Sequence, residues 1–313
     1  MLRVIPLRHH QRSLEGRPAL VLSDVIDLLA DPVDGTALRQ GDGSWRTLVS
    51  ESGHSYDVAR QGYVTLAGGA GLRYSGDDAE MIQARETFLS GGHFARFVEA
   101  VTDNVTRALD DAGVPDDVPP SILEVGAGTG YYLAHTLDSI DGARGVGIDV
   151  SVPAAKRLAH CHPRVGAVVA DAWSRLPLRD GSVNAVTVIF APRNAAEFAR
   201  VLAPEGQVVV LTADSGHLAE LREPLGIIDV EEGKVDRMIA QASGHLVPVG
   251  EPETVEFSME LDQASIAAQI GMSPSARHIH PKVLAERIAD LPETMTVTAR
   301  ASVTRLKRDP QLG

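Results

Sequence analysis

The chain has 313 residues, of which 44% are apolar and 23% are charged, a balance typical of globular proteins that excludes wholesale disorder. Its 29 Lys and Arg against 42 Asp and Glu give a formal net charge of −13, which excludes a strongly basic coat protein for nucleic acid but not a local basic face. The single cysteine, Cys161, excludes internal disulfides and multi-cysteine metal sites, and no apolar run reaches the roughly 18 residues of a membrane span.

The first 118 residues fall into three predicted parts. Residues 1–22 form an arm without clear periodicity, and because they lack the apolar core of a signal peptide we expect a soluble, cytoplasmic protein. Residues 23–75 contain turn signals such as DPVDG and QGDGSW and form a small subdomain. Residues 76–118 are a helical linker, since apolar side chains recur there at helical spacing.

Strands and helices alternate in the remaining domain, residues 119–313. Its apolar runs are the predicted strands 121–125, 145–150, 165–170, 184–190 and 206–212. Continuous apolar strands that alternate with helices predict an α/β fold with a doubly wound, mostly parallel sheet. Two later strands, near 254–261 and 295–306, are expected to form an antiparallel pair at the sheet edge.

The strongest chemical signal is the motif ILEVGAGTGYYL at residues 122–133, in which a strand reaches Glu124 and a helix soon follows. Gly126, Gly128 and Gly130 allow a ligand to approach the backbone and the amides of the helix N-terminus. Related turns occur in dinucleotide sites, so this turn alone does not identify the ligand.

Acidic residues at the ends of the next two strands narrow the choice of ligand. Asp149 ends the second strand, where an acid can bind both hydroxyls of a ribose, and Asp171 and Ala172 follow the third, within reach of an adenine amino group. The alternative is that both acids only cap helices. The order of Glu124, the glycine turn and the two acids resembles class I S-adenosylmethionine-dependent methyltransferases. That resemblance implies a Rossmann-like, seven-stranded sheet that binds S-adenosylmethionine through these residues.

The fourth strand ends in FAPRN, residues 190–194. In the fold that the resemblance implies, this strand end faces the methyl group that is transferred. Arg193 and Asn194 are therefore candidate catalytic residues, Phe190 a candidate cofactor contact and Pro192 a candidate substrate contact. The alternative, which is compatible with the first, is that Pro192 starts the next helix and Asn194 caps it.

FAPRN occurs together with GHSYDVARQGYVTL (53–66), GDDAEMIQARETFLSGGHF (76–94) and MSPSARH (272–278). With these segments, nearly the whole chain resembles the bacterial 23S rRNA guanine-N1 methyltransferases, which include tylosin-resistance methyltransferases. The resemblance implies a zinc-binding N-terminal module, a class I methyltransferase domain, often a homodimer, a hairpin of 23S rRNA as partner and a possible role in macrolide resistance. Arg193 would then stabilise the negative charge that develops on guanine O6.

Further site residues follow from the same resemblance. His93 matches a family motif position and is expected to line the cofactor pocket, although a lone histidine more often caps a helix. Gln83 and Arg85 are candidates to bind the methionine carboxylate. Arg277 and His278, which follow the MSPS turn, are candidate substrate contacts.

The chain departs from the family at the zinc ligands. The family uses a Cys-x-x-Cys pair and a later Cys-x-x-x-His pair, and the matching residues here are Asp31, Asp34, Ser50 and His54. Structural zinc prefers thiolate and imidazole, so we expect no zinc and a subdomain held by apolar packing. A residual metal site made by the two aspartates and the histidine is the alternative.

The sequence leaves open which molecule accepts the methyl group. An RNA substrate requires basic side chains to be concentrated, because phosphate neutralisation drives RNA binding. A small-molecule methyltransferase derived from the family fits the lost zinc ligands and the acidic charge, and a binding protein without turnover is a third possibility. The candidate RNA-binding arginines are Arg3, Arg8, Arg12, Arg17, Arg39, Arg46, Arg60 and Arg73.

Overall fold

The computed structural model describes residues 18–69, 71–115, 117–227, 232–273 and 279–312. Two of the expected substrate contacts, Arg277 and His278, lie outside these ranges, as does most of the predicted arm. Within the described ranges, no helix combines the length and the apolar character that crossing a membrane requires.

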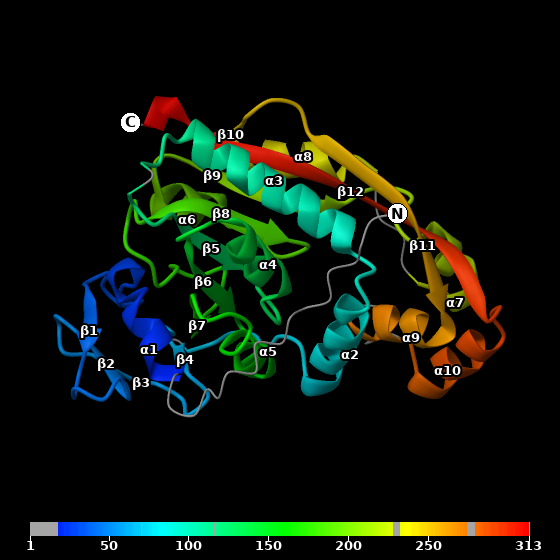
Figure 1. The fold of residues 1–313 in the computed structure, drawn as a ribbon, viewed down its shortest axis with the longest axis horizontal. Coiled ribbons are helices and arrows are strands. Elements are labelled where there is room, and N and C mark those ends of the chain that lie inside the picture. Colours follow the sequence, from blue (N-terminus) through cyan, green and yellow to red (C-terminus); the bar gives the residue numbers. More distant parts are fainter. Residues whose placement is uncertain (1–17, 70, 116, 228–231, 274–278, 313) are drawn as a thin grey trace.

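A nine-stranded sheet, to which several helices pack on each face, runs through the described part of the molecule (Figure 1). Its strands are β4 (Tyr63–Thr65), β5 (Ser121–Val125), β6 (Arg144–Asp149), β7 (Val165–Val169), β8 (Val183–Ile189), β9 (Leu202–Ala213), β10 (Leu246–Pro248), β11 (Glu253–Asp262) and β12 (Thr294–Arg308). They lie in the order β10-β12-β9-β8-β5-β6-β7-β4, and β11 also pairs with β12. The strands from β4 to β9 are parallel to their neighbours, whereas β12 is antiparallel to β9, β10 and β11.

The expected seven-stranded sheet is present as β7-β6-β5-β8-β9-β12-β11, and β4 and β10 extend it. The last long strands form the expected antiparallel pair, with Glu253 opposite Val303 and Asp262 opposite Thr294. β12 is not an edge strand, because its other side also pairs with β9.

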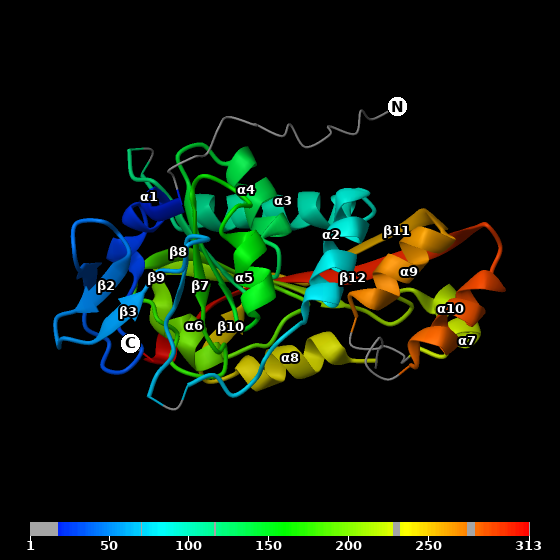
Figure 2. The ribbon, with the colours of Figure 1, turned by 90° about the horizontal axis from the view of Figure 1, so that it is seen from below.

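Helices cover both faces of the sheet, with α3 and α4 on one side and α6 and α8 on the other (Figure 2). The helices are α1 (Pro18–Ser23), α2 (Ala79–Ser90), α3 (Ala95–Asp111), α4 (Tyr131–Ser139), α5 (Val152–Leu158), α6 (Ala195–Val201), α7 (Arg222–Leu225), α8 (Lys234–Ala242), α9 (Gln263–Gly271) and α10 (Pro281–Ala289), with 3-10 turns η1 (Ile26–Leu28), η2 (Ala219–Leu221) and η4 (Pro310–Leu312).

The two faces hold separate apolar cores because side chains alternate along each strand. In β5, Ile122 packs with Phe97 of α3 in one core, whereas Leu123 packs with Phe198 of α6 in the other. Every residue of β5 is buried. Because each face of β5 packs into one of the two cores, the strand has no face exposed to solvent and lies at the centre of the sheet.

The N-terminal subdomain is built around a small antiparallel sheet of β1 (Leu38–Gln40), β2 (Thr47–Ser50) and β3 (Ser55–Asp57). The same stretch of chain also reaches the main sheet, since β4 pairs in parallel with β7. Arg144 of β6 forms an ion pair with Asp27 at 2.6 Å, which ties the start of the subdomain to the main sheet. Residues 23–75 therefore contact the main sheet both through this ion pair and through β4 at its outer edge.

Candidate active site

The C-terminal ends of β5, β6, β7 and β8 open into one cavity of about 550 Å³. Open α/β sheets bind ligands at this end of their strands. The cavity brings together most of the residues that the sequence predicts for the cofactor. Its lining includes Gly126, Gly128, Asp149, Asp171, Ala172, Phe190 and Pro192.

The turn between β5 and α4 requires its glycines. Gly126, Gly128 and Gly130 have φ angles of 72°, 55° and 78°, in the left-handed region that L side chains rarely adopt. A Cβ on Gly130 would also lie 2.5 Å from Cys161 Sγ. The turn can therefore hold its shape only with glycine, and it leaves the backbone open toward the cavity.

Asp149 at the end of β6 supports this turn and also faces the cavity. Its Oδ2 accepts the N–H of Gly128 at 2.8 Å, and its Oδ1 accepts the N–H of Ser151 at 2.8 Å. Burial raises the pKa of Asp149, and the two backbone N–H groups oppose that rise. Each carboxylate oxygen has a further lone pair, so Asp149 can still accept hydrogen bonds from two ribose hydroxyls.

Asp171 and Ala172 follow β7 on the adjacent side of the cavity. Asp171 is 5% exposed, and its Oδ1 accepts the N–H of Trp173 at 2.9 Å. Trp173 lines the same cavity although its side chain is 56% exposed. A buried acceptor beside an open indole ring fits a purine ring with an amino group.

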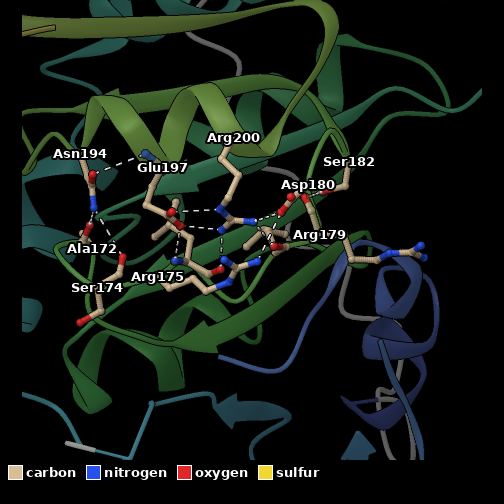
Figure 3. Close-up of polar contacts among 11 residues, drawn as sticks. Ala172, Ser174, Arg175, Arg179, Asp180, Ser182, Asn194, Glu197 and Arg200 are labelled. Atoms are coloured by element: carbon tan, nitrogen blue, oxygen red, sulfur yellow. Dashed lines mark hydrogen bonds and ion pairs between the residues drawn. The ribbon is translucent and has the colours of Figure 1, made fainter. Parts of the chain in front are cut away.

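The loop that carries these residues is fixed by contacts from α6 (Figure 3). Asn194 Nδ2 donates to the carbonyl oxygen of Ala172 at 3.1 Å, and Asn194 Oδ1 accepts the N–H of Glu197 as the N-cap of α6. Glu197 Oε2 accepts the N–H of Leu176, and Arg200 donates to the Leu178 carbonyl oxygen at 2.8 Å. Asn194 therefore caps the helix and also positions the Asp171 loop.

Two buried polar atoms without partners lie around this cavity. Among the described residues, neither Arg85 Nε nor Gln269 Oε1 has a hydrogen-bond partner, and both side chains line the cavity. Arg85 is held by Asp77 at 2.6 Å, and its Cδ would lie 3.4 Å from a Cβ on Gly128. A guanidinium donor and an amide acceptor next to the glycine turn suit the carboxylate and the ammonium group of an amino acid.

Gln83, the other candidate for that carboxylate, lies elsewhere. It accepts a hydrogen bond from Arg157 at 3.4 Å and lines a separate surface depression between α2, α4 and α5. His93 is likewise not among the residues that line the cavity, although its neighbour Phe94 is. Its Nε2 is 3.2 Å from Ser265 Oγ, and its ring packs against Phe88 at 4.9 Å.

Glu124 lies beneath the glycine turn and does not line the cavity. Its Oε2 has no hydrogen-bond partner in the described part of the chain. Burial raises the pKa of Glu124 to about 8, with a smaller opposing effect of the Leu133 N–H. Burial therefore favours the neutral form of this carboxyl group.

Arg193 is not among the residues that line the cavity, although the nearby Phe190 is. Its Nη2 donates to Oγ1 of Thr212, a fully buried residue of β9, at 2.9 Å. Burial lowers the pKa of Arg193, and its Nε has no partner among the described residues. The structure thus brings Pro192 to the cavity and places the Arg193 guanidinium between the ends of β8 and β9.

Sequence reasoning missed several residues of the cavity. Most of them come from segments far apart in the chain that no local motif marks. Trp173, next to the predicted Ala172, and Phe94, at the end of the segment 76–94, were the two that a local signal could have identified. The missed lining residues include Tyr74, Phe94, Trp173, His217 and Gln269.

The residues at the family's zinc positions meet in the N-terminal subdomain. The possible ligand atoms of Asp31, Asp34 and His54 all lie within 4.8 Å of one another. Asp31 is fully buried; its Oδ1 accepts from the Tyr56 hydroxyl and the Val33 N–H, both at 2.8 Å, and its Oδ2 is 2.8 Å from His54 Nδ1.

These atoms already have hydrogen-bond partners within the protein. Asp34 Oδ1 accepts from the Thr36 hydroxyl at 2.7 Å, and Ser50 Oγ accepts the N–H of His54 at 3.0 Å. Two carboxylates, one imidazole and one hydroxyl, without a thiolate, do not fit structural zinc. Side-chain hydrogen bonds hold together the positions that ligands occupy in the family.

The strand order, with β12 alone antiparallel in the seven-stranded core, and the glycine turn followed by acids at successive strand ends define a class I S-adenosylmethionine-dependent methyltransferase. The profile of the family described as "Methyltransferase domain" matches residues 122–206. A solved methyltransferase of Thiobacillus denitrificans, bound to S-adenosyl-L-homocysteine, is 14% identical with a TM-score of 0.41, over 67% of this chain and 91% of that one.

Curated relatives give the particular family. The chain is 38% identical over 281 residues to the 23S rRNA (guanine(748)-N(1))-methyltransferase of Streptomyces fradiae, covering 90% of this chain and 97% of that protein. It is 41% identical to a protein of Micromonospora griseorubida whose name proposes 23S rRNA guanine-N1 methyltransferase activity, covering 91% of this chain and 98% of that protein. The chain belongs to the 23S rRNA guanine-N1 methyltransferase family.

Proposed function

We propose that this methyltransferase transfers a methyl group to N1 of a guanine in a hairpin of 23S rRNA. The observation that carries the proposal is the relation to guanine-N1 methyltransferases over 97% or more of their length, which includes the N-terminal subdomain as well as the cofactor domain. We place the enzyme in the cytoplasm, where its substrate is found, and expect a homodimer. The resemblance to tylosin-resistance methyltransferases supports a further role of this methylation in protecting the ribosome against macrolides.

The cavity supports a division of tasks among the residues of this chain. S-adenosylmethionine supplies an electrophilic methyl group when it is bound. In this proposal Asp149 accepts the ribose hydroxyls and Asp171 the adenine amino group, while Arg85 and Gln269 bind the amino-acid end. Their place in the lining of one cavity supports these roles. Phe190 and Pro192 form the adjoining wall, which is where we place the acceptor base.

The N-terminal subdomain offers basic groups for an RNA backbone. Arg39, Arg46, Arg60 and Arg73 are all exposed. Exposed guanidinium groups can neutralise phosphates even in a chain with a net charge of −13, because the attraction is local and screened beyond about 10 Å at 0.1 M salt. That acidic charge is also the observation that favours the competing hypothesis of a small-molecule acceptor.

The deciding experiment measures tritium transfer from S-adenosylmethionine to ribosomal RNA purified from a strain that lacks the family enzyme. We expect label at one guanine of 23S rRNA, and no label with the Asp149→Ala variant. If wild-type protein that binds cofactor leaves the RNA unlabelled, the RNA proposal is wrong and a small-molecule acceptor becomes the better explanation.

A further inference from the structure

His217 lines the cavity beside Phe190, in the turn that follows β9. Its ring forms a triangle with those of Phe94 and Phe190. The ring centroids are 6.0 Å apart for Phe190 and His217, 6.0 Å for Phe94 and His217, and 6.3 Å for the two phenylalanines. All three side chains line the same cavity as the glycine turn and Asp149.

The hydrogen bond to Arg300 fixes the tautomer of His217. The backbone N–H of Arg300 donates to Nδ1 at 3.1 Å, so Nδ1 carries no proton and a neutral ring must carry its proton on Nε2. Burial, assisted by the positive charge of Arg222, lowers the pKa of His217 to about 4, so the ring is neutral at pH 7. Among the described residues, Nε2 has no hydrogen-bond partner of its own.

Phe190 provides an open ring beside this donor. Its φ angle of 51° lies in the left-handed region, which is unfavourable for a residue with a side chain. Its side chain is nevertheless 42% exposed, so apolar burial does not account for the strained conformation. Strain of this kind is concentrated at functional sites, and an exposed ring at a cavity wall suits stacking with a nucleobase.

We propose that His217 is a catalytic residue whose Nε2–H donates a hydrogen bond to O6 of the acceptor guanine while the base stacks on Phe190. This inference rests on the proposed function. The N1 proton leaves to water before the transfer. N1 then bonds to the methyl carbon, while the carbon–sulfur bond breaks and its electron pair stays on sulfur. Loss of that proton places negative charge on O6, and a donor aimed at O6 stabilises that charge.

The geometry favours His217 over Arg193 for this task. The Arg193 guanidinium donates to Thr212 and is not among the groups that line the cavity. His217 cannot be the base that removes the N1 proton, because Nδ1 is occupied by the Arg300 N–H and Nε2 already carries a proton. His217 can therefore only donate a hydrogen bond, and a hydrogen-bond donor is the group that stabilises an oxyanion.

Two substitutions separate donation from structural support. In His217→Asn the amide oxygen can still accept the Arg300 N–H, but no donor reaches the position of Nε2. In His217→Gln the amide nitrogen reaches that position, while the Nδ1 acceptor is lost. We expect His217→Asn to lower kcat about 10²-fold, His217→Gln to recover at least part of that loss, and both variants to bind S-adenosylhomocysteine as the wild type does in calorimetry.

The pH profile of kcat provides a readout that a merely structural role would not move. If Nε2–H stabilises the deprotonated base, the pH of half-maximal rate should rise by about one to two units in His217→Asn, since one unit corresponds to a factor of ten. A folded His217→Asn enzyme with wild-type kcat and an unchanged profile would overturn the inference. Failure of the wild type to label 23S rRNA would instead overturn the proposed function.

Discussion

The cavity at the sheet end differs from the hydrogen-bonded cluster in the N-terminal subdomain in whether its buried polar groups have hydrogen-bond partners. At the cavity, Arg85 Nε and Gln269 Oε1 have no partner among the described residues. In the subdomain, the fully buried carboxylate of Asp31 accepts from Val33 and Tyr56 and pairs with His54. At the wall of the cavity the unused hydrogen-bonding capacity is available to a ligand, whereas the hydrogen bonds of Asp31 are used within the subdomain.

The largest expected effect is at the cavity. Asp149→Ala removes both the ribose acceptor and the partner of the Gly128 N–H, so we expect the dissociation constant for S-adenosylhomocysteine to rise about 10³-fold in calorimetry, or about 4 kcal/mol. Asp141→Ala, an exposed acid in the α4–β6 turn, is the matched control and should bind normally. A change below about tenfold for Asp149→Ala would contradict this assignment of the ribose site.

The next effect tests the subdomain. Asp31→Ala leaves the Tyr56 hydroxyl, the Val33 N–H and His54 without their partner, so we expect opening of the β1–β3 sheet to become easier by about 3 kcal/mol. Hydrogen exchange of the amides in β2 measures that opening. Asp42→Ala removes a carboxylate that bonds only within an exposed turn, and we expect a change below about 1 kcal/mol for it. Equal effects of the two substitutions would mean that Asp31 has no special role.

A third prediction uses pH to examine a titratable group of the cavity. The pKa of His217 is about 4 in the folded protein, below its unfolded value of 6.5. Below pH 6.5 the folded state therefore binds fewer protons than the unfolded state. The part of the unfolding free energy that depends on His217 is fully present above pH 6.5 and is lost as the pH falls toward 4. Between pH 7 and pH 5 the wild type should lose about 2 kcal/mol more unfolding free energy than His217→Asn, whose side chain does not titrate. Urea unfolding of both proteins at the two pH values measures the difference, and equal losses would show that His217 is not held neutral.

The cofactor side of the cavity was predictable because its signals are local. Gly126 and Gly128 lie in one turn, and Asp149 and Asp171 each follow an apolar run that sequence alone identifies as a strand. The acceptor side was not predictable in this way. His217 acquires its tautomer from Arg300, a residue 83 positions away on β12, and no spacing within a motif encodes that contact.

In the subdomain, too, the sequence predicted the features carried by a local motif and missed a contact between residues far apart in the chain. The sequence identified Asp31, Asp34, Ser50 and His54 as replacements for metal ligands, and the predicted compensation was apolar packing. Leu48 is fully buried as that packing requires, but the polar contacts of Asp31 add a second stabilising element. Asp31 and Tyr56 are 25 residues apart, so their hydrogen bond became visible only in the folded chain.

The smallest expected effect concerns metal. Burial alone would raise the pKa of Asp31, but hydrogen bonds from Val33, Ser50, Tyr56 and His54 lower it, so this carboxylate is already stabilised as an anion without a cation. We therefore expect a chelator to shift the melting temperature by less than about 1 °C and elemental analysis to find no stoichiometric zinc. The triple variant Asp31→Cys, Asp34→Cys, Ser50→Cys tests the converse: together with His54 it supplies three thiolates and an imidazole at positions that already meet in space, so it should bind about one zinc ion per chain and become sensitive to the chelator. Zinc in the unmodified protein, with loss of stability on chelation, would show that the hydrogen-bonded cluster is a metal site after all.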